Sequence, residues 1–221
     1  MRYALALILL AACGDDGGKT PDSGAKLELQ GEIVDWDSND LQFCGVFGAA
    51  LKARSDTTLT DSTNPNGRID MMVPDGAQVL IDVTPPTTQP ECVTGTGLYQ
   101  IPGTIVTSNT VINSGKTVSY RMIGMDRVTP FFTGLGITID TSKAIVYVHV
   151  EGTQKAVTSS GAHDTAIAFD GTNWAAGSTG VDVVFPNTAP GTTMVDAGGS
   201  LGAGSIPTTA GQFTYVTLVN Q

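Results

Sequence analysis

The sequence predicts a mainly β fold, organised as two antiparallel β-sandwich modules joined by a short helical connector. Most of the 221 residues fall into short runs rich in Val, Ile, Thr and aromatic side chains, which favour strands. Gly, Pro, Asn and Asp separate these runs, and 27 glycines and 11 prolines supply the turns. Few segments repeat their apolar residues at the helical period. Short strands at this spacing are typical of sandwiches of antiparallel sheets.

The chain begins with an apolar run, residues 3–12, that follows Arg2 and ends in two alanines. A transmembrane helix needs roughly 20 apolar residues, so this run is too short to span and instead predicts an export signal over residues 1–12. Leu10-Ala11-Ala12-Cys13 closely resembles the lipobox of bacterial lipoproteins. The resemblance implies that Cys13 is the lipidated first residue of the mature protein. An ordinary secretory signal followed by a buried cysteine is the alternative.

Residues 13–26 form an acidic, glycine-rich stretch with few apolar side chains, so we expect a flexible tether after the lipidated Cys13. The protein is therefore expected in the cell envelope of a Gram-negative bacterium, with its head in the periplasm or at the cell surface. The inner-membrane retention signal of enteric bacteria resembles an Asp directly after the lipidated Cys. Here Gly14 takes that place and Asp15 comes one later, so both the inner and the outer membrane stay open.

The first predicted module covers residues 27–115. Turns such as Asn64-Pro65-Asn66-Gly67 and Pro74-Asp75-Gly76 have the chemistry that short β-connections require. Strands are expected at residues 27–35, 48–54, 68–73, 78–84, 97–101 and 104–112.

Four segments of this module carry a family resemblance: GEIVD (31–35), VFGAALKA (46–53), TLTDSTNPNGRIDMMVPDG (58–76) and VLIDV (79–83). They resemble the pattern of carboxypeptidase regulatory-like, transthyretin-related domains. In that family a G-x-V-x-D strand is followed by a Gly-Ala strand, a T-D-x-x-G turn, a strand that ends in Val-Pro-x-Gly and a final strand. The resemblance implies a β-sandwich. An insertion between Asp61 and Gly67, and Cys44 before the Gly-Ala strand, depart from the pattern.

Residues 116–137 are predicted to be the helical connector. We expect a helix over residues 117–126, then a short second turn in which Thr129 caps, Pro130 takes the first helical position and Gly134 ends it. The Met and Phe side chains are expected to pack against a sheet, with a hydrophobic ligand groove as the alternative. The apolar residues that step by three and four, and so define one helical stripe, are Val118, Met122, Met125, Val128, Phe132 and Leu135.

The second predicted module covers residues 138–221. Strands are expected at residues 144–151, 165–169, 180–185, 192–195 and 212–219. The segment GVDVVFPNTAPGTTMV (180–195) resembles the end of the same family unit, where a strand closes on Phe-x-Asn and a Pro-Gly turn leads into the last strand. This weaker resemblance implies a second sandwich.

Two cysteines remain once Cys13 carries the lipid. In an oxidising compartment Cys44 and Cys92 are expected to form a disulfide, which could contribute about 4 kcal/mol by restricting the unfolded chain. Their spacing fits no zinc pattern, and the only histidines are His149 and His163, so no metal site is predicted.

The formal net charge of −10 argues against nucleic acid as a partner. Basic patches for anionic lipid headgroups are also absent, so membrane contact is expected to rest on the lipid alone.

Three sequence patterns resemble catalytic motifs without their context. Ser200 lies in a G-x-S-x-G sequence, but no histidine follows it in the chain and glycine-rich loop flanks it. His163 with Asp164, after two serines, has the composition of an ordinary turn. Residues 114–117, Ser-Gly-Lys-Thr, resemble the last residues of a P-loop, but Thr110 occupies the position where that loop needs glycine. We therefore predict no catalytic residue and no cofactor.

Two further patterns have a binding interpretation. Residues 35–40 alternate oxygen ligands like the first half of an EF-hand loop, although Asp40 replaces its glycine and Val46 its bidentate Glu; a solvated acidic turn is favoured over a calcium site. Trp36 and Trp174 each lie in a loop beside Asp or Asn and could stack on a sugar ring. The alternative, that each caps the end of a sandwich core, is favoured over a sugar site.

Together these patterns predict a lipid-anchored envelope protein that acts as a non-enzymatic structural or interaction module, with the membrane as one partner and a protein or glycan as another. A lipoprotein that binds glycan or peptide through loops near Trp36 and Trp174 is the second hypothesis. A hydrolase built on Ser200 is the third.

Overall fold

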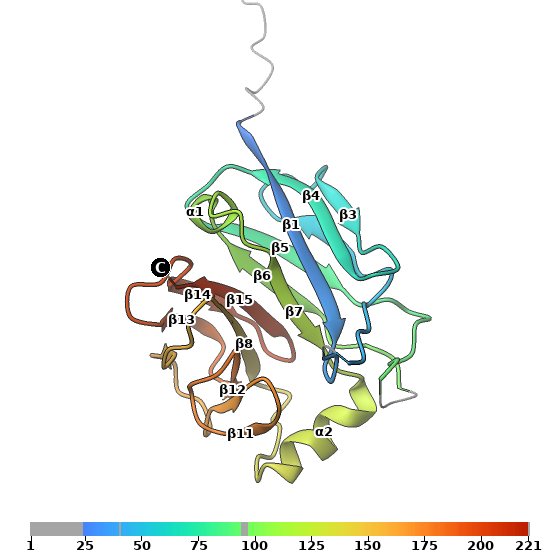
Figure 1. Cartoon of the computed structure of the whole chain (residues 1–221), viewed down its shortest axis with the longest axis vertical. Coiled ribbons are helices and arrows are strands. Elements are labelled where there is room, and N and C mark those ends of the chain that lie inside the picture. Colours follow the sequence, from blue (N-terminus) through green and yellow to red (C-terminus); the bar gives the residue numbers. More distant parts are fainter. Residues whose placement is uncertain (1–23, 40, 94–96, 221) are drawn as a thin grey trace, which may run out of the picture.

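The computed structural model describes residues 24–39, 41–93 and 97–220, so the predicted signal, Cys13 and most of the tether lie outside the described residues. The chain is mainly β, with sheets stacked in a sandwich-like arrangement (Figure 1). The helices are α1 (Asn109–Ile112) and α2 (Met125–Gly134). The strands are β1 (Lys26–Asp35), β2 (Ala50–Ala53), β3 (Thr60–Ser62), β4 (Arg68–Pro74), β5 (Val79–Thr84), β6 (Gly103–Thr107), β7 (Val118–Met122), β8 (Ala144–Glu151), β9 (Thr158–Ser159), β10 (Ile167–Phe169), β11 (Trp174–Ala176), β12 (Asp182–Thr188), β13 (Gly191–Asp196), β14 (Gly204–Thr208) and β15 (Phe213–Val219).

A nine-stranded sheet forms the central layer, in the order β11-β10-β12-β8-β15-β6-β5-β2-β3. Its middle strand is the last one of the chain, β15, which pairs in parallel with both β6 and β8. Every residue of β15 is buried, as expected for a strand with parallel neighbours and covered faces. Its sequence FTYVTLV is accordingly apolar or Thr at every position rather than alternating with charges.

The sheet crosses the predicted boundary between modules. β6 belongs to residues 27–115 and β8 to residues 138–221, and β15 bonds to both. The two halves therefore share one sheet, and three strand pairs are parallel: β1 with β7, and β15 with each neighbour. A division into two wholly antiparallel modules does not describe this pairing.

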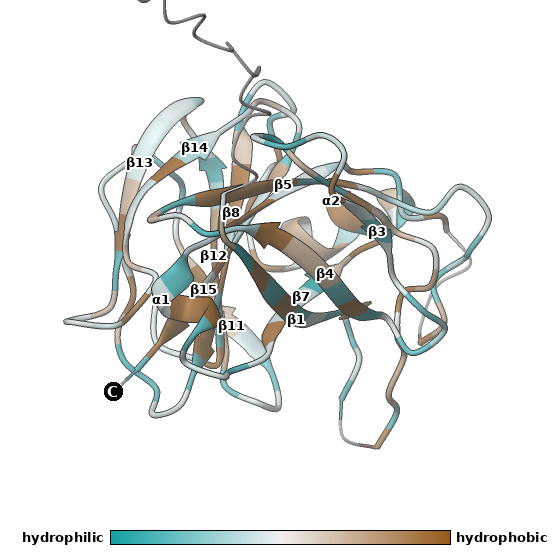
Figure 2. Ribbon diagram, turned by 90° about the horizontal axis from the view of Figure 1, so that it is seen from above, coloured by the Kyte–Doolittle hydropathy of each residue, from teal (hydrophilic) through white to brown (hydrophobic). Residues whose placement is uncertain are grey.

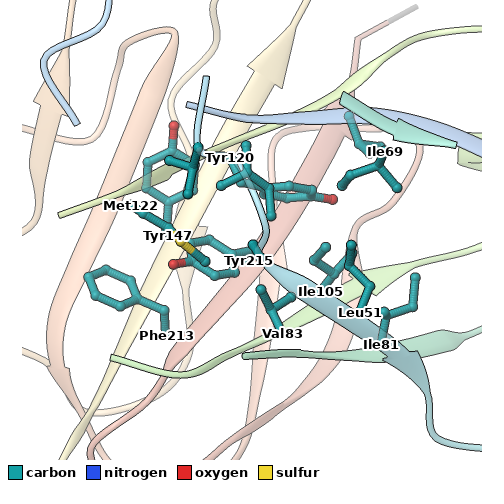
Figure 3. Close-up of a cluster of buried hydrophobic side chains, with 14 of the residues drawn as sticks. Leu51, Ile69, Ile81, Val83, Ile105, Tyr120, Met122, Tyr147, Phe213 and Tyr215 are labelled. Atoms are coloured by element: carbon teal, nitrogen blue, oxygen red, sulfur yellow. The ribbon is translucent and has the colours of Figure 1, made fainter. Parts of the chain in front are cut away.

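A three-stranded sheet, β4-β1-β7, covers one face of the central sheet. The core between them includes side chains from both predicted modules, because Tyr147 and Tyr215 belong to the same buried cluster as Leu51 and Ile81. Figure 3 shows part of this core, with Ile69, Tyr120 and Met122 of the cover sheet and Val83, Ile105 and Phe213 of the central sheet. Figure 2 shows apolar colouring on β5 and β15, and both apolar and hydrophilic residues along β4.

The opposite face is covered by a second small sheet, β14-β13-β9. Alternation along the central strands supplies this separate core: Val146, Val148 and Val216 face it, whereas Tyr147 and Tyr215 face the other. The sheet β14-β13-β9 and its connections supply the other side of this core, chiefly through Val157, Val195, Ala197 and Ile206.

The predicted connector at residues 116–137 is only partly helical. Residues 118–122 form a strand, β7, that pairs with β1, so the helix expected over residues 117–126 is wrong. Val118, Tyr120 and Met122 are buried in alternation, which is the period of a strand. Val118 and Met122 lie four residues apart, a spacing that fits both the helical period and the strand period. Only the pairing with β1 shows that the segment is a strand.

The helix α2 begins after Gly124 and runs through Pro130, so Thr129 is not a cap and Pro130 is not its first residue. Val128 and Phe132 are its buried side chains, and both pack in the larger core. The expected packing against a sheet is therefore confirmed for Phe132 and Val128 but not for Met125, which is 46% exposed.

Two predicted strands also change. Residues 97–101 make only isolated bridges, and residues 104–112 divide into β6 and α1, whose first turn is capped by the Ser108 hydroxyl. The short strands β3, β9, β11 and β14 are not anticipated by the sequence patterns. Among the described residues, no helix has the length and apolar character to cross a bilayer.

The predicted disulfide between Cys44 and Cys92 is confirmed, with 6.1 Å between the Cα atoms. It joins the loop after β1 to the loop after β5.

Candidate functional site

A hollow of about 700 Å³ lies where the loop after β1, the strand β7 and the β10–β11 hairpin meet, and this volume is within the range of ligand sites. We call it the tryptophan hollow. It is lined by Trp36, Asp37, Asn39, Leu41, Arg121, Phe169, Gly171, Thr172, Asn173, Trp174 and Val181.

The two tryptophans predicted as candidates meet in this hollow. Their rings stack at 4.8 Å between centroids with planes 9° apart. Trp36 is fully buried, and Trp174 is half-buried. The Phe131 ring meets both indoles edge-on, at 5.2 and 5.7 Å. Trp36 thus caps the core as the alternative interpretation expected, and it supports Trp174, which retains exposed surface.

The β10–β11 hairpin sets the position of Trp174. Phe169 and Trp174 lie directly opposite each other in the antiparallel pairing of β10 and β11, and their ring centroids are 5.3 Å apart. In the turn between them, Asp170 Oδ1 accepts hydrogen bonds from the backbone N–H groups of Asn173 and Thr172, both at 2.8 Å, and these bonds lower the pKa of Asp170. Gly171 at φ 101° provides the backbone conformation that the turn needs. The turn therefore holds Thr172 and Asn173 in fixed, exposed positions beside the indole.

Arg121 of β7 lies against the other side of the hollow. Its Nε donates to Asp182 Oδ2 at 2.8 Å, and its Nη1 donates to the carbonyl oxygens of Trp36 and Ser38 at 3.2 and 2.6 Å. The guanidinium carbon also lies 5.2 Å from the centre of the Phe169 ring, in cation–π distance. One side chain thus ties the cover sheet, the loop after β1 and the central sheet together.

Asp182 is the buried centre of this first ionic network. Besides Arg121, it accepts from Tyr147 Oη at 2.6 Å and lies 2.8 Å from His149 Nδ1. Burial lowers the pKa of His149, but the hydrogen bonds and charges of Asp182 and Glu151 outweigh it and raise the pKa to about 9. His149 is therefore a cation at neutral pH, paired with two carboxylates. Sequence reasoning missed this network, although Arg121 and Asp182 stand out as charges within otherwise apolar strands.

A second network surrounds Arg127 of α2. It pairs with Asp37, with Glu91 at 3.2 Å and with the buried Asp35 at 3.9 Å. Asp35 also accepts from Tyr99 Oη at 2.6 Å. Two acidic members of the turn considered for calcium thus share one guanidinium with Glu91, and the network holds the loop that carries Leu41.

The disulfide lies beside this network. Ligand atoms of Asp35, Cys44 and Cys92 lie within 4.8 Å of one another, but both sulfurs are committed to the disulfide and do not offer thiolates to a metal.

The residues of the hydrolase hypothesis are not assembled. Ser200 is buried, and within the described part of the chain its hydroxyl has no hydrogen-bond partner. His149 is engaged with Asp182, and His163 contacts the Asp164 carbonyl and the Phe185 ring.

No family model and no curated protein matches this chain. A solved structure with detectable similarity is a double mutant of the shaft pilin SpaA from Lactobacillus rhamnosus GG. It is 8% identical, the alignment covers 89% of this chain and 98% of the pilin chain, and the TM-score is 0.26. This similarity is too low to assign a family or a function, and the resemblance to carboxypeptidase regulatory-like domains stays a prediction.

Proposed function

We propose that this protein is a lipid-anchored, non-enzymatic interaction module of the bacterial cell envelope, and that the tryptophan hollow is its recognition surface. The observation that carries the proposal is the exposed part of Trp174, held in a hollow of about 700 Å³ by stacking on buried Trp36. A concave site with aromatic lining and a few polar groups is the usual form of a ligand site.

Preorganisation supports this interpretation. The loop after β1 is held by Arg121 and Arg127 and by the nearby disulfide, and the hairpin opposite is held by its Asp170 turn. A site whose walls are already ordered loses little conformational entropy when a ligand binds. Leu41 is fully exposed at its rim, in a hydrogen-bonded turn, so its side chain is accessible to a ligand.

The placement of the hollow suits an anchored protein. β1 begins at Lys26, at the upper end of the molecule in Figure 1, and ends at Asp35 beside Trp36. Ten strand residues span about 30 Å. A chain anchored at Cys13 would enter the head at the first end of β1, so the hollow would lie about 30 Å along the head from the point where the tether joins it.

The anchor is tested by replacing Cys13. We expect the wild-type protein to incorporate labelled palmitate and to sediment with membranes, whereas Cys13→Ser loses the label and yields a soluble or unprocessed form, because no thiol remains to acylate. Cys92→Ser is the matched control, since it removes a different cysteine and should retain the label. Palmitate incorporation by Cys13→Ser would contradict a lipid anchor at this residue.

The recognition surface is tested by photo-crosslinking in cells. A benzophenone amino acid at Asn173, on the rim of the hollow, is expected to form adducts with an envelope component, and adding Trp174→Ala is expected to abolish them. The control position is Asn113, an exposed asparagine at the end of α1. Equal adducts at both positions, or adducts that do not depend on Trp174, would count against the hollow as a binding site.

A further inference from the structure

We infer that the ligand of the tryptophan hollow is a neutral glycan, one pyranose ring of which stacks on the exposed surface of Trp174. This inference rests on the proposed function and names the chemical class of its ligand. The geometry points to it through three features: a single flat platform, neutral polar groups at its edge, and charges that are already paired.

The platform has a fixed orientation. Trp36 stacks on Trp174 with planes 9° apart, and Phe131 and Phe169 pack against the same indole at 5.7 and 5.3 Å. With these contacts the indole is half-buried, and it lines the hollow. The C–H groups on one face of a pyranose pack well on such a surface, while the ring hydroxyls project sideways to hydrogen-bonding groups.

The groups beside the platform match hydroxyls. Thr172 and Asn173 are exposed in the turn that precedes Trp174, and within the described residues neither side chain has a hydrogen-bond partner. A hydroxyl and a carboxamide can each donate and accept, as sugar hydroxyls do. Asn39 across the hollow is different, because its side chain already accepts from the N–H groups of Leu41 and Gln42 and donates to the Asp37 carbonyl.

The charged groups of the hollow are already paired. Arg121 is neutralised by Asp182, and Asp37 is paired with Arg127. An anionic ligand would need a free cation, and the formal net charge of −10 repels it further. A neutral ligand leaves both pairs intact.

A peptide fits this site less well than a sugar. Extended peptides are usually held by main-chain hydrogen bonds along a free strand edge. The edge strand at the hollow is β11, which has only three residues, so it offers few such bonds. Trp174 presents one aromatic surface rather than a row of side-chain pockets.

The test is a binding titration of the full-length protein in a detergent without a sugar headgroup. The probes are cellohexaose, chitohexaose and maltohexaose, with hexa-alanine as the peptide probe. We expect saturable binding of at least one hexasaccharide and none of hexa-alanine. Trp174→Ala is expected to weaken that binding by about tenfold or more, since stacking on an aromatic ring is lost. Trp174→Phe, which keeps a flat ring, should bind within a few-fold of the wild type.

Phe47→Ala is the matched control, because it truncates an exposed aromatic residue that does not line the hollow. It should bind the hexasaccharide like the wild type. No hexasaccharide binding, or binding that Trp174→Ala leaves unchanged, would overturn the glycan assignment. Hexa-alanine binding that depends on Trp174 would overturn it too but would leave the hollow as a recognition surface. The proposed function is tested by a different experiment. It fails if cross-linking at Asn173 does not depend on Trp174, whatever the titration shows.

Discussion

Replacing Asp182 by Ala is expected to lower the free energy of unfolding by about 3–5 kcal/mol, because it leaves the buried Arg121 without its carboxylate and leaves His149 with only Glu151 as a partner. Asp182 is 1% exposed and pairs with Arg121 and His149, whose side chains are only 15% and 17% exposed. It also accepts a hydrogen bond from Tyr147, whose hydroxyl would lose its partner. Urea unfolding of the two proteins, followed by tryptophan fluorescence and by circular dichroism, measures the difference.

Asp82→Ala is the matched control. Asp82 also pairs with an arginine, Arg54 at 2.6 Å, but its side chain is 49% exposed. Exposed pairs contribute about 0–1 kcal/mol. A loss for Asp182→Ala no larger than for Asp82→Ala would show that burial does not give the network its strength.

The same network gives stability a defined pH dependence. The pKa of His149 is raised to about 9, whereas an unfolded histidine titrates near 6.5. Its stabilisation is therefore complete below about pH 6.5 and is lost as the pH rises through about 9. Burial raises the pKa of Asp182, but His149 and Arg121 outweigh it and lower the pKa, so this contribution is lost as the pH falls below about 4. The stability of Asp182→Ala should decline less between pH 6.5 and 9 than that of the wild type, because only Glu151 is then left to raise the pKa of His149.

Placing a charge in the middle strand is expected to unfold both halves of the protein. Val216 is 0% exposed and lies in β15, which bonds to β6 on one side and β8 on the other. Val216→Asp would bury an unpaired carboxylate in an apolar layer, at a cost comparable with the whole stability of a domain. Hydrogen exchange read by mass spectrometry should show loss of protection in β5 as well as in β12.

The control for this change is Ala210→Asp, which introduces the same charge at an exposed position just before β15. In this variant the amides of both β5 and β12 should stay protected from hydrogen exchange. If Val216→Asp exposes residues 138–221 while residues 27–115 stay protected, the halves are independent modules after all.

Local sequence patterns were sufficient for much of the fold. The alternation of apolar residues and the turn chemistry predicted most long strands, including β1, β4, β5 and β8 within a few residues. They failed for β7, where Val118 and Met122 fit a helix and a strand equally well. They also failed for strands of two or three residues such as β9 and β11, which exist because a neighbour offers them an edge.

The candidate site was only partly predictable. Trp36 and Trp174 were recognised as residue types suited to a sugar, but sequence could not show that they touch or that only Trp174 remains exposed. Arg121 was not recognised, because its segment was expected to be a helix, and its partner Asp182 lies in a strand far along the chain.

By itself, the sequence determined the mainly β character and the cysteine pair available for a disulfide, because both depend on residue type and local period. Only the tertiary structure decided that the final strand β15 lies in the middle of the central sheet and joins the two halves. It also decided that two distant tryptophans form one platform. The physical reason is that backbone hydrogen bonds and side-chain contacts between sequence-distant strands depend on which surfaces are left to bury, and no local pattern encodes that choice.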